Sequence, residues 1–165
     1  MSTEMNNQQP QVEPINPMPE YPMKWYKFLI NFLLFASAVL NLINGFRYLT
    51  GAIYGDVNPE LVYAFFDGLK PLDMVVGVAC IALAIFAIYT RMRLANFKKD
   101  APKCVYALYI AGAAISLIYV LIAQAVIGVD GGIPAETIGS IVGSGVMVIC
   151  NYTYFQKRQS LFVND

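Results

Sequence analysis

The sequence contains no histidine and only three cysteines in 165 residues. The cysteines lie far apart and form no C-x-x-C pair, so we expect no disulfide framework. Without histidine and with few carboxylates, the usual ligand sets for zinc, haem and non-haem iron cannot be assembled. We therefore predict no metal and no cofactor. Because no catalytic set of nucleophile and base can be assembled either, we expect that the protein is not an enzyme.

Charge is also scarce. Charged residues make up 13% of the chain, against about 25% in soluble proteins. Apolar residues reach 58%, which exceeds the soluble average of about 45–50%. The eleven basic and eleven acidic residues cancel, so net charge gives no reason to expect a nucleic-acid partner, and we predict none. A water-soluble core cannot hide this much apolar surface, which indicates a membrane protein whose first partner is the lipid bilayer.

Four segments are long and apolar enough to cross a hydrocarbon core of about 30 Å, which takes about 20 residues of helix. Helix is favoured over strand because an open sheet would leave unpaired backbone groups in lipid. The fourth segment is the least apolar, since glycine and serine dilute it. The sequence predicts an all-α membrane protein, a four-transmembrane-helix bundle within residues 24–158, with spans at about 28–48, 72–90, 104–127 and 135–154.

The distribution of Lys and Arg predicts the orientation. Nine of the eleven lie before the first span, between the second and third, or after the fourth, and two lie in the other connections. Cytoplasmic loops carry the excess of Lys and Arg, so both termini are expected in the cytoplasm, in a multi-pass protein of a bacterial plasma membrane. The largest group is a basic cytoplasmic loop that could also attract anionic lipid: Arg91, Arg93, Lys98, Lys99 and Lys103.

Three shorter segments complete the domain prediction. Residues 1–23 combine five prolines with polar residues, which is typical of a disordered cytoplasmic tail. Residues 159–165 are predicted as a short cytoplasmic C-terminal tail. In the first outer loop, Asn58-Pro59-Glu60 precedes apolar residues at helical spacing, which predicts a short helix lying on the outer membrane surface.

Polar residues concentrate in the outer halves of the predicted spans. Ser37, Asn41, Asn44 and Tyr48 follow one another at spacings of four, three and four, so they share one face of the first span. One interpretation is an outward-facing polar cavity, with Arg47 and Asp73 paired at its mouth. The alternative, which we favour from sequence, is that these groups only hold helices together. The residues proposed for the cavity are Asn41, Asn44, Arg47, Asp73, Tyr119, Gln124 and Ser140.

Small residues suggest where helices approach one another. In the fourth span, Gly139 and Gly143, beside Ser140 and Ser144, form small-xxx-small patterns that we expect to pack within the monomer. The second span also has a face of small residues that begins with an acid: Asp73, Gly77, Cys80, Ala84 and Ala87.

These features predict a non-enzymatic structural or accessory partner of another membrane component, which could be a second copy of this chain. The alternative is a small transporter or ligand-binding membrane protein that uses the outer polar cavity. A cavity lined by Asn41, Asn44 and Asp73 would support the alternative, whereas full packing of these side chains against neighbouring helices would remove it.

Overall fold

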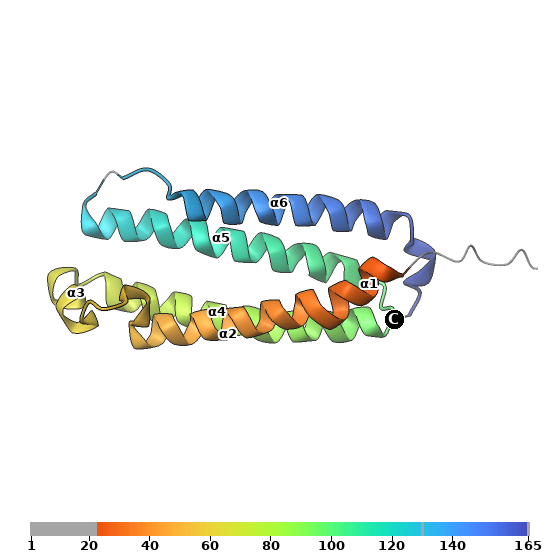
Figure 1. Cartoon of the computed structure of the whole chain (residues 1–165), viewed down its shortest axis with the longest axis horizontal. Helices are drawn as coiled ribbons and strands as arrows, with labels where there is room; N and C mark the ends of the chain where they lie inside the picture. Colours follow the sequence, from red (N-terminus) through yellow and green to blue (C-terminus); the bar gives the residue numbers. More distant parts are fainter. Residues whose placement is uncertain (1–22, 130, 165) are drawn as a thin grey trace, which may run out of the picture.

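The computed structural model describes residues 23–129 and 131–164, and it is helical almost throughout (Figure 1). The predicted N-terminal tail lies outside the described residues except for Met23. The first long helix runs from residue 24 to 50 without interruption and contains one π-helical turn. The elements in chain order are α1 (Lys24–Phe28), the π-turn η1 (Leu29–Leu33), α2 (Leu34–Thr50), the 3₁₀ turn η2 (Ala52–Tyr54), α3 (Pro59–Phe65), α4 (Leu69–Ala95), α5 (Ala101–Ile127), α6 (Ala135–Gln156) and the 3₁₀ turn η3 (Gln159–Leu161).

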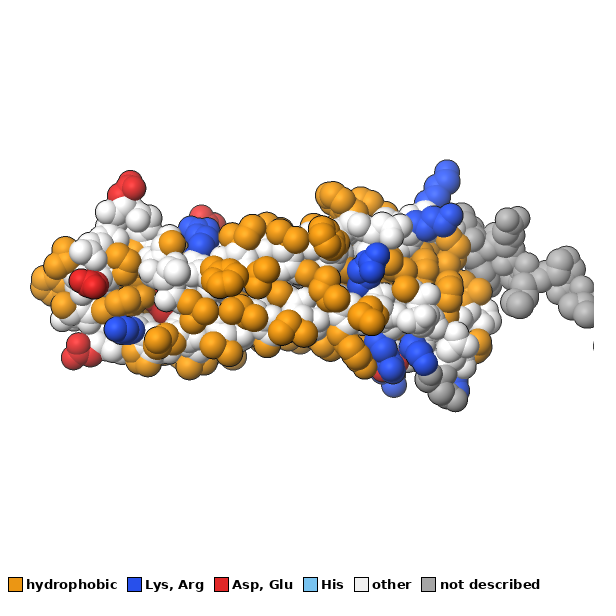
Figure 2. All heavy atoms as spheres, turned by 90° about the horizontal axis from the view of Figure 1, so that it is seen from below, with side chains coloured by type: hydrophobic (Ala, Val, Ile, Leu, Met, Phe, Trp, Pro, Cys, Tyr) orange, Lys and Arg blue, Asp and Glu red, His pale blue; other side chains and the backbone are white. Residues whose placement is uncertain are grey.

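Within the described residues, four helices are long and apolar enough to cross a membrane. Their mean hydropathies are 1.8, 2.4, 2.3 and 1.3 in chain order, so the fourth is the least apolar, as predicted. In Figure 2 apolar side chains cover the middle of the visible face, and charged side chains gather toward its two ends. The predicted all-α class and the four apolar segments are therefore confirmed, and they fit a multi-pass membrane protein. The helices extend a few residues beyond the predicted bounds, over 24–50, 69–95, 101–127 and 135–156.

Local sequence signals explain where several helices begin and end. The side chain of Asn58 accepts a hydrogen bond of 2.9 Å from the Glu60 amide, and Pro59 occupies the first turn of α3. The predicted short helix is thus present. Helices α2 and α5 both end at a glycine in the left-handed conformation, Gly51 with φ 75° and Gly128 with φ 74°.

The four long helices form two packed pairs, α2 with α4 and α5 with α6, and the contact between α4 and α5 joins the pairs (Figure 1). The small-residue face predicted for the second span is buried along α4. Gly77 on this face meets Gly45 of α2. A Cβ atom added to Gly45 would lie 2.7 Å from Cγ1 of Ile81 and 3.0 Å from the Gly77 carbonyl oxygen. The two backbones therefore approach closely at this crossing.

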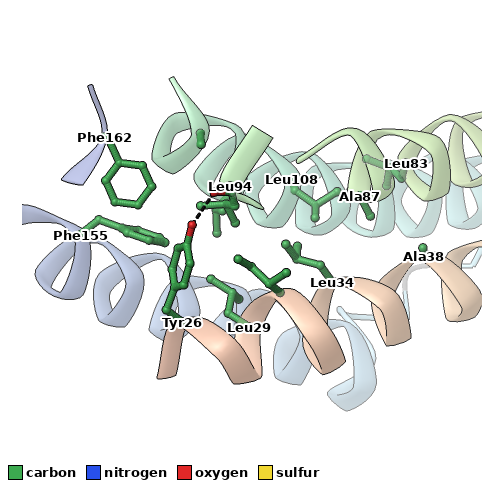
Figure 3. Packing of buried hydrophobic residues seen from close by; sticks show 13 residues of the cluster. Tyr26, Leu29, Leu34, Ala38, Leu83, Ala87, Leu94, Leu108, Phe155 and Phe162 are labelled. Carbon is green, nitrogen blue, oxygen red and sulfur yellow. Dashed lines mark hydrogen bonds between the residues drawn. The ribbon is translucent and has the colours of Figure 1, made fainter. Parts of the chain in front are cut away.

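The apolar core occupies the half of the molecule opposite α3. We call this half the basic end and the other half the α3 end. At the basic end, Trp25 Nε1 donates to Asn151 Oδ1 over 3.2 Å and links α1 to α6. The Tyr26 hydroxyl donates to the Leu94 carbonyl and links α1 to α4 (Figure 3). Figure 3 shows the buried side chains between these helices, which include Leu29, Leu34, Leu83, Ala87, Leu94, Leu108, Phe155 and Phe162.

The C-terminal segment, predicted as a short tail, packs against the basic end. Phe162 is buried, and its ring lies against those of Tyr26, Phe97 and Phe155. The Asn164 amide donates to the Phe97 carbonyl over 3.3 Å, and the Lys99 amide donates to the Asn164 carbonyl over 3.0 Å. Residues 159–164 therefore complete the core at this end.

Candidate functional site

A polar cleft of about 310 Å³ lies among the four long helices, between the apolar core and the α3 end. Helices α2 and α6 face it from opposite sides and are not one of the packed pairs. The volume is at the lower end of the range for small-molecule sites, about 300–1,000 Å³. The cleft is lined by Ser37, Asn41, Asn44, Tyr48, Val76, Cys80, Leu83, Leu108, Tyr109, Gly112, Ile115, Ser116, Tyr119, Ser140 and Ser144.

The polar wall of the cleft begins with α2. The four residues predicted to share one face of this helix all line the cleft: Ser37, Asn41, Asn44 and Tyr48. Asn41 Nδ2 donates to the Ser37 carbonyl over 2.8 Å, within its own helix. Asn44 is exposed. Asn41 and Asn44 therefore line the cleft, and within the described residues neither side chain forms a hydrogen bond with a neighbouring helix.

Helices α5 and α6 supply hydroxyl groups on the opposite wall. Ser116 and Tyr119 come from α5, and Ser140 and Ser144 from α6. Gly112 leaves room between them, because a Cβ atom there would meet only Leu83, at 4.0 Å. Leu83 also belongs to the core, as does Leu108, so the cleft ends on the packed apolar half of the molecule.

No charged side chain is among the residues that line the cleft in the described part of the chain. Its polar groups are hydroxyls and carboxamides, which both donate and accept hydrogen bonds. Such a surface can hold an uncharged polar molecule, whereas an ion in it would have no opposite charge to offset its desolvation.

Asp73 lies beside the cleft in a cluster of tyrosines. Its side chain is 1% exposed, and its Oδ2 accepts hydrogen bonds from the hydroxyls of Tyr54, at 2.7 Å, and Tyr63, at 3.0 Å. Its Oδ1 is buried and has no hydrogen-bond partner among the described residues. Burial, and then the hydrogen bond to Asp73, raise the pKa of Tyr63 to about 12 and raise that of Tyr54 further. Both phenols thus stay protonated at neutral pH and act as donors to the carboxylate.

Two further tyrosines connect this cluster to the cleft. The rings of Tyr48 and Tyr119 meet edge to face with centroids 5.0 Å apart, and both residues line the cleft. Each also interacts electrostatically with the Asp73 carboxylate. The pair therefore lies between the cleft and the cluster, which we call the Asp73 cluster: Asp73, Tyr54 and Tyr63.

The predicted pairing of Arg47 with Asp73 is wrong. Arg47 is exposed and makes no ion pair with Asp73, whose donors are phenols. The physical reason is the path of the first loop, in which η2 and α3 fold back over the start of α4 and bring two tyrosine hydroxyls to the carboxylate. The sequence pattern identifies neither Tyr54 nor Tyr63 as a partner of Asp73, because both contacts depend on the path of this loop.

The remaining predicted outer residues divide between cleft and loop. Asn41, Asn44, Tyr119 and Ser140 come together in the cleft. Gln124 does not, because its Nε2 donates to the carbonyls of residues 131 and 132, at 3.0 and 2.7 Å, and so holds the turn between α5 and α6.

The small-residue pattern of α6 also differs from its prediction. A Cβ atom added to Gly139 or Gly143 would meet nothing within 4 Å, so these glycines do not pack within the monomer. Ser140 and Ser144, on another side of the helix, line the cleft. The serines therefore serve the cleft, and the glycines leave an open face on α6.

The predicted basic loop lies at the basic end, and two of its arginine side chains form contacts within the protein. Arg93 forms an ion pair with Asp100, and its Nε donates to Asp100 Oδ1 over 3.0 Å. This hydrogen bond lowers the pKa of Asp100. Arg91 Nε donates to the Ile30 carbonyl over 3.1 Å. Lys99 and Lys103 line a second pocket of about 420 Å³ between α5 and the end of α6.

Comparison of the chain with protein-family models, with curated proteins and with solved structures gives no match. Within residues 23–129 and 131–164, no group of three or more His, Cys, Asp or Glu side chains could hold a metal ion, and the three cysteines are free.

Proposed function

We propose that this protein binds a small, uncharged polar molecule in the cleft, as a ligand-binding or transport protein of the membrane. The observation that carries the proposal is a volume of about 310 Å³ lined by hydroxyl and amide side chains between helices apolar enough to cross a membrane. Polar groups at membrane depth are costly unless they face a cavity or each other. Here Asn41, Asn44, Ser116 and Ser140 face a common open volume, which favours binding over simple helix packing.

The proposal includes an orientation. We place the basic end in the cytoplasm, because Lys and Arg concentrate there, and the α3 end outside, so that the cleft faces outward. Leu61 and Phe65 of α3 are 57% and 80% exposed, which supports a helix that rests its apolar side on the outer membrane surface. With this orientation both termini lie in the cytoplasm, and we propose that the membrane is a bacterial plasma membrane.

Cys80 provides a native reporter for the cleft, because it is one of the lining residues and 8% of its surface is exposed. In a chain carrying Cys104→Ala and Cys150→Ala, we expect Cys80 to react with a small membrane-impermeant methanethiosulfonate added to intact cells. A Ser116→Phe substitution, which fills the cleft, should slow this reaction at least tenfold. In purified protein, a panel of uncharged polyols, sugars and amides should include solutes that protect Cys80 in a saturable way.

Two cysteines in a chain without native cysteine serve as topology controls. Val57→Cys in the loop before α3 should react from outside, and Lys157→Cys at the basic end should not. If Val57→Cys reacts but Cys80 does not, the orientation stands and the open cleft is lost. If Lys157→Cys reacts and Val57→Cys does not, the orientation is reversed. Reaction of Cys80 that neither Ser116→Phe nor any solute slows would sink the binding proposal.

A second candidate function is that of an accessory partner to another membrane protein. The observation in its favour is the open glycine face of α6, since Gly139 and Gly143 have nothing within 4 Å of their Cβ positions. Among the long helices, α6 packs mainly on α5, and small residues allow a further helix to approach closely.

Photocrosslinking tests this second candidate. A benzophenone side chain placed at Val142, beside the glycine face, should capture a reproducible partner in native membranes, identified by mass spectrometry. The same group at Ile118, an exposed residue of α5, is the matched control. Recovery of the same products from both positions, or of none from Val142, would contradict an accessory role for this face.

A further inference from the structure

We propose that the groove between α5 and α6 binds one anionic phospholipid, with its phosphate in the pocket at the basic end and an acyl chain along the apolar groove above it. The headgroup pocket shares no lining residue with the polar cleft, and the apolar pocket shares only Ser144 with it, so the inference does not depend on the function proposed for the cleft.

The headgroup pocket has the residues that a phosphate requires. Lys99 and Lys103, which carry ammonium groups, line one side, and Gln156 and Gln159, which carry amide groups, line the other; Gln156 Nε2 also donates to the Tyr152 hydroxyl over 2.6 Å. No acidic residue lines this pocket within the described residues. The nearest acid in sequence, Asp100, is engaged by Arg93. The pocket is thus electropositive and rich in donors, which suits a phosphodiester anion.

The floor of the pocket is apolar and aromatic. The rings of Tyr106 and Tyr152 lie 6.0 Å apart, and Phe155 and Phe162 connect them to the core. Aromatic residues with a polar edge are typical of the level at which helices leave the bilayer. A free phosphate would not use this apolar floor, whereas the glycerol backbone of a lipid would cover it.

A second, almost purely apolar pocket of about 310 Å³ lies between the same two helices, farther from the basic end. On α5, residues 103, 106, 110, 113 and 117 follow at spacings of three and four, so the two pockets lie along one face of this helix. On α6 the groove passes Tyr152, Gly145 and Ile141. From residue 106 to residue 117 the rise is about 16 Å, comparable to one leaflet of the hydrocarbon core. A basic pocket in line with an apolar pocket over this length matches an amphiphile.

Native mass spectrometry of the full chain in detergent, titrated with phosphatidylglycerol or phosphatidylcholine, tests the proposal. We expect one phosphatidylglycerol to be retained at least tenfold more tightly than phosphatidylcholine. The double substitution Lys99→Gln and Lys103→Gln should weaken its retention about 30-fold, which corresponds to about 1 kcal/mol for each lysine. The matched control is Lys27→Gln with Lys157→Gln, which removes the same charge at the same end but outside the pocket, and it should change retention less than threefold.

A second pair of variants tests the acyl groove. Gly145→Leu places a side chain in the groove, and we expect it to weaken retention of phosphatidylglycerol at least fivefold. Gly139→Leu, whose Cβ also meets nothing within 4 Å but which lies outside the groove, is its control. Circular dichroism verifies that all four variants stay folded.

Several outcomes would overturn the lipid site. Equal retention of both lipids by the unaltered chain would show that the headgroup is not recognised. If both lysine double variants lost retention of phosphatidylglycerol equally, the effect would come from net charge and not from the pocket. Displacement of phosphatidylglycerol by inorganic phosphate, at an ionic strength matched with chloride, would assign the pocket to a free anion.

Discussion

Replacing Tyr54 and Tyr63 together by phenylalanine is expected to lower the free energy of unfolding by about 3–5 kcal/mol, because a hydrogen bond to a charged group is worth about 1.5–3 kcal/mol. The two substitutions remove both hydroxyl donors to Asp73 Oδ2 and leave a carboxylate that is 1% exposed without these hydrogen bonds. Unfolding in mixed micelles of dodecyl sulfate and a mild detergent, followed by circular dichroism at neutral pH, measures the loss.

Asp73→Asn provides the decisive comparison. In the double tyrosine variant, this further substitution removes the buried charge, so we expect it to recover at least half of the lost stability. In the unaltered chain the same substitution should be destabilising, because the phenols then donate to a neutral amide. Tyr89→Phe, at an exposed tyrosine of α4, is the matched control. We expect its free energy of unfolding to stay within about 0.5 kcal/mol of that of the parent, which is the usual range for surface substitutions. Additive losses without rescue would mean that the Asp73 cluster is not a unit.

The second large effect is expected at the crossing of α2 and α4. Gly45→Leu should destabilise the protein by about 3 kcal/mol, near the upper end of the range for overpacking. Its Cβ alone would lie 2.7 Å from Cγ1 of Ile81 and 3.0 Å from the Gly77 carbonyl oxygen, so the helices must separate. The same measurement of unfolding in mixed micelles applies.

Gly143→Leu is the control for this crossing. It gives the same gain in helix propensity, about 0.8–1 kcal/mol relative to glycine, but its Cβ meets nothing within 4 Å. We expect it to be neutral or slightly stabilising in detergent. If both variants had the same stability, the close approach of α2 and α4 at Gly45 would not limit the fold.

The sequence predicts the elements well because their signals are local. Mean hydropathy locates the four long helices, and Asn58 followed by Pro59 locates the start of α3. The shared face of Ser37, Asn41, Asn44 and Tyr48 depends only on helical spacing, and the structure keeps it together along one wall of the cleft.

Tertiary partners could not be predicted because they depend on the rotation of each helix and on the path of each loop. The close crossing of α2 and α4 depends on one glycine from each helix, Gly45 and Gly77. The repeated glycines of α6, Gly139 and Gly143, face open space instead. Arg47 has the charge that Asp73 would attract, yet the path of the loop places the hydroxyls of Tyr54 and Tyr63 against this carboxylate instead. The role of Phe162 also depends on a turn that brings the chain end back over the core.

The late position of Phe162 bears on how the chain is assembled during synthesis. Each packed pair consists of hydrophobic helices that follow one another in sequence, so α2 and α4 can dock before α5 has been translated. Closure of the basic end must wait, because Phe162, which packs against Tyr26, Phe97 and Phe155, is translated after all four long helices. The first long helix and the ring of Phe162 therefore meet only after the fourth long helix has been made.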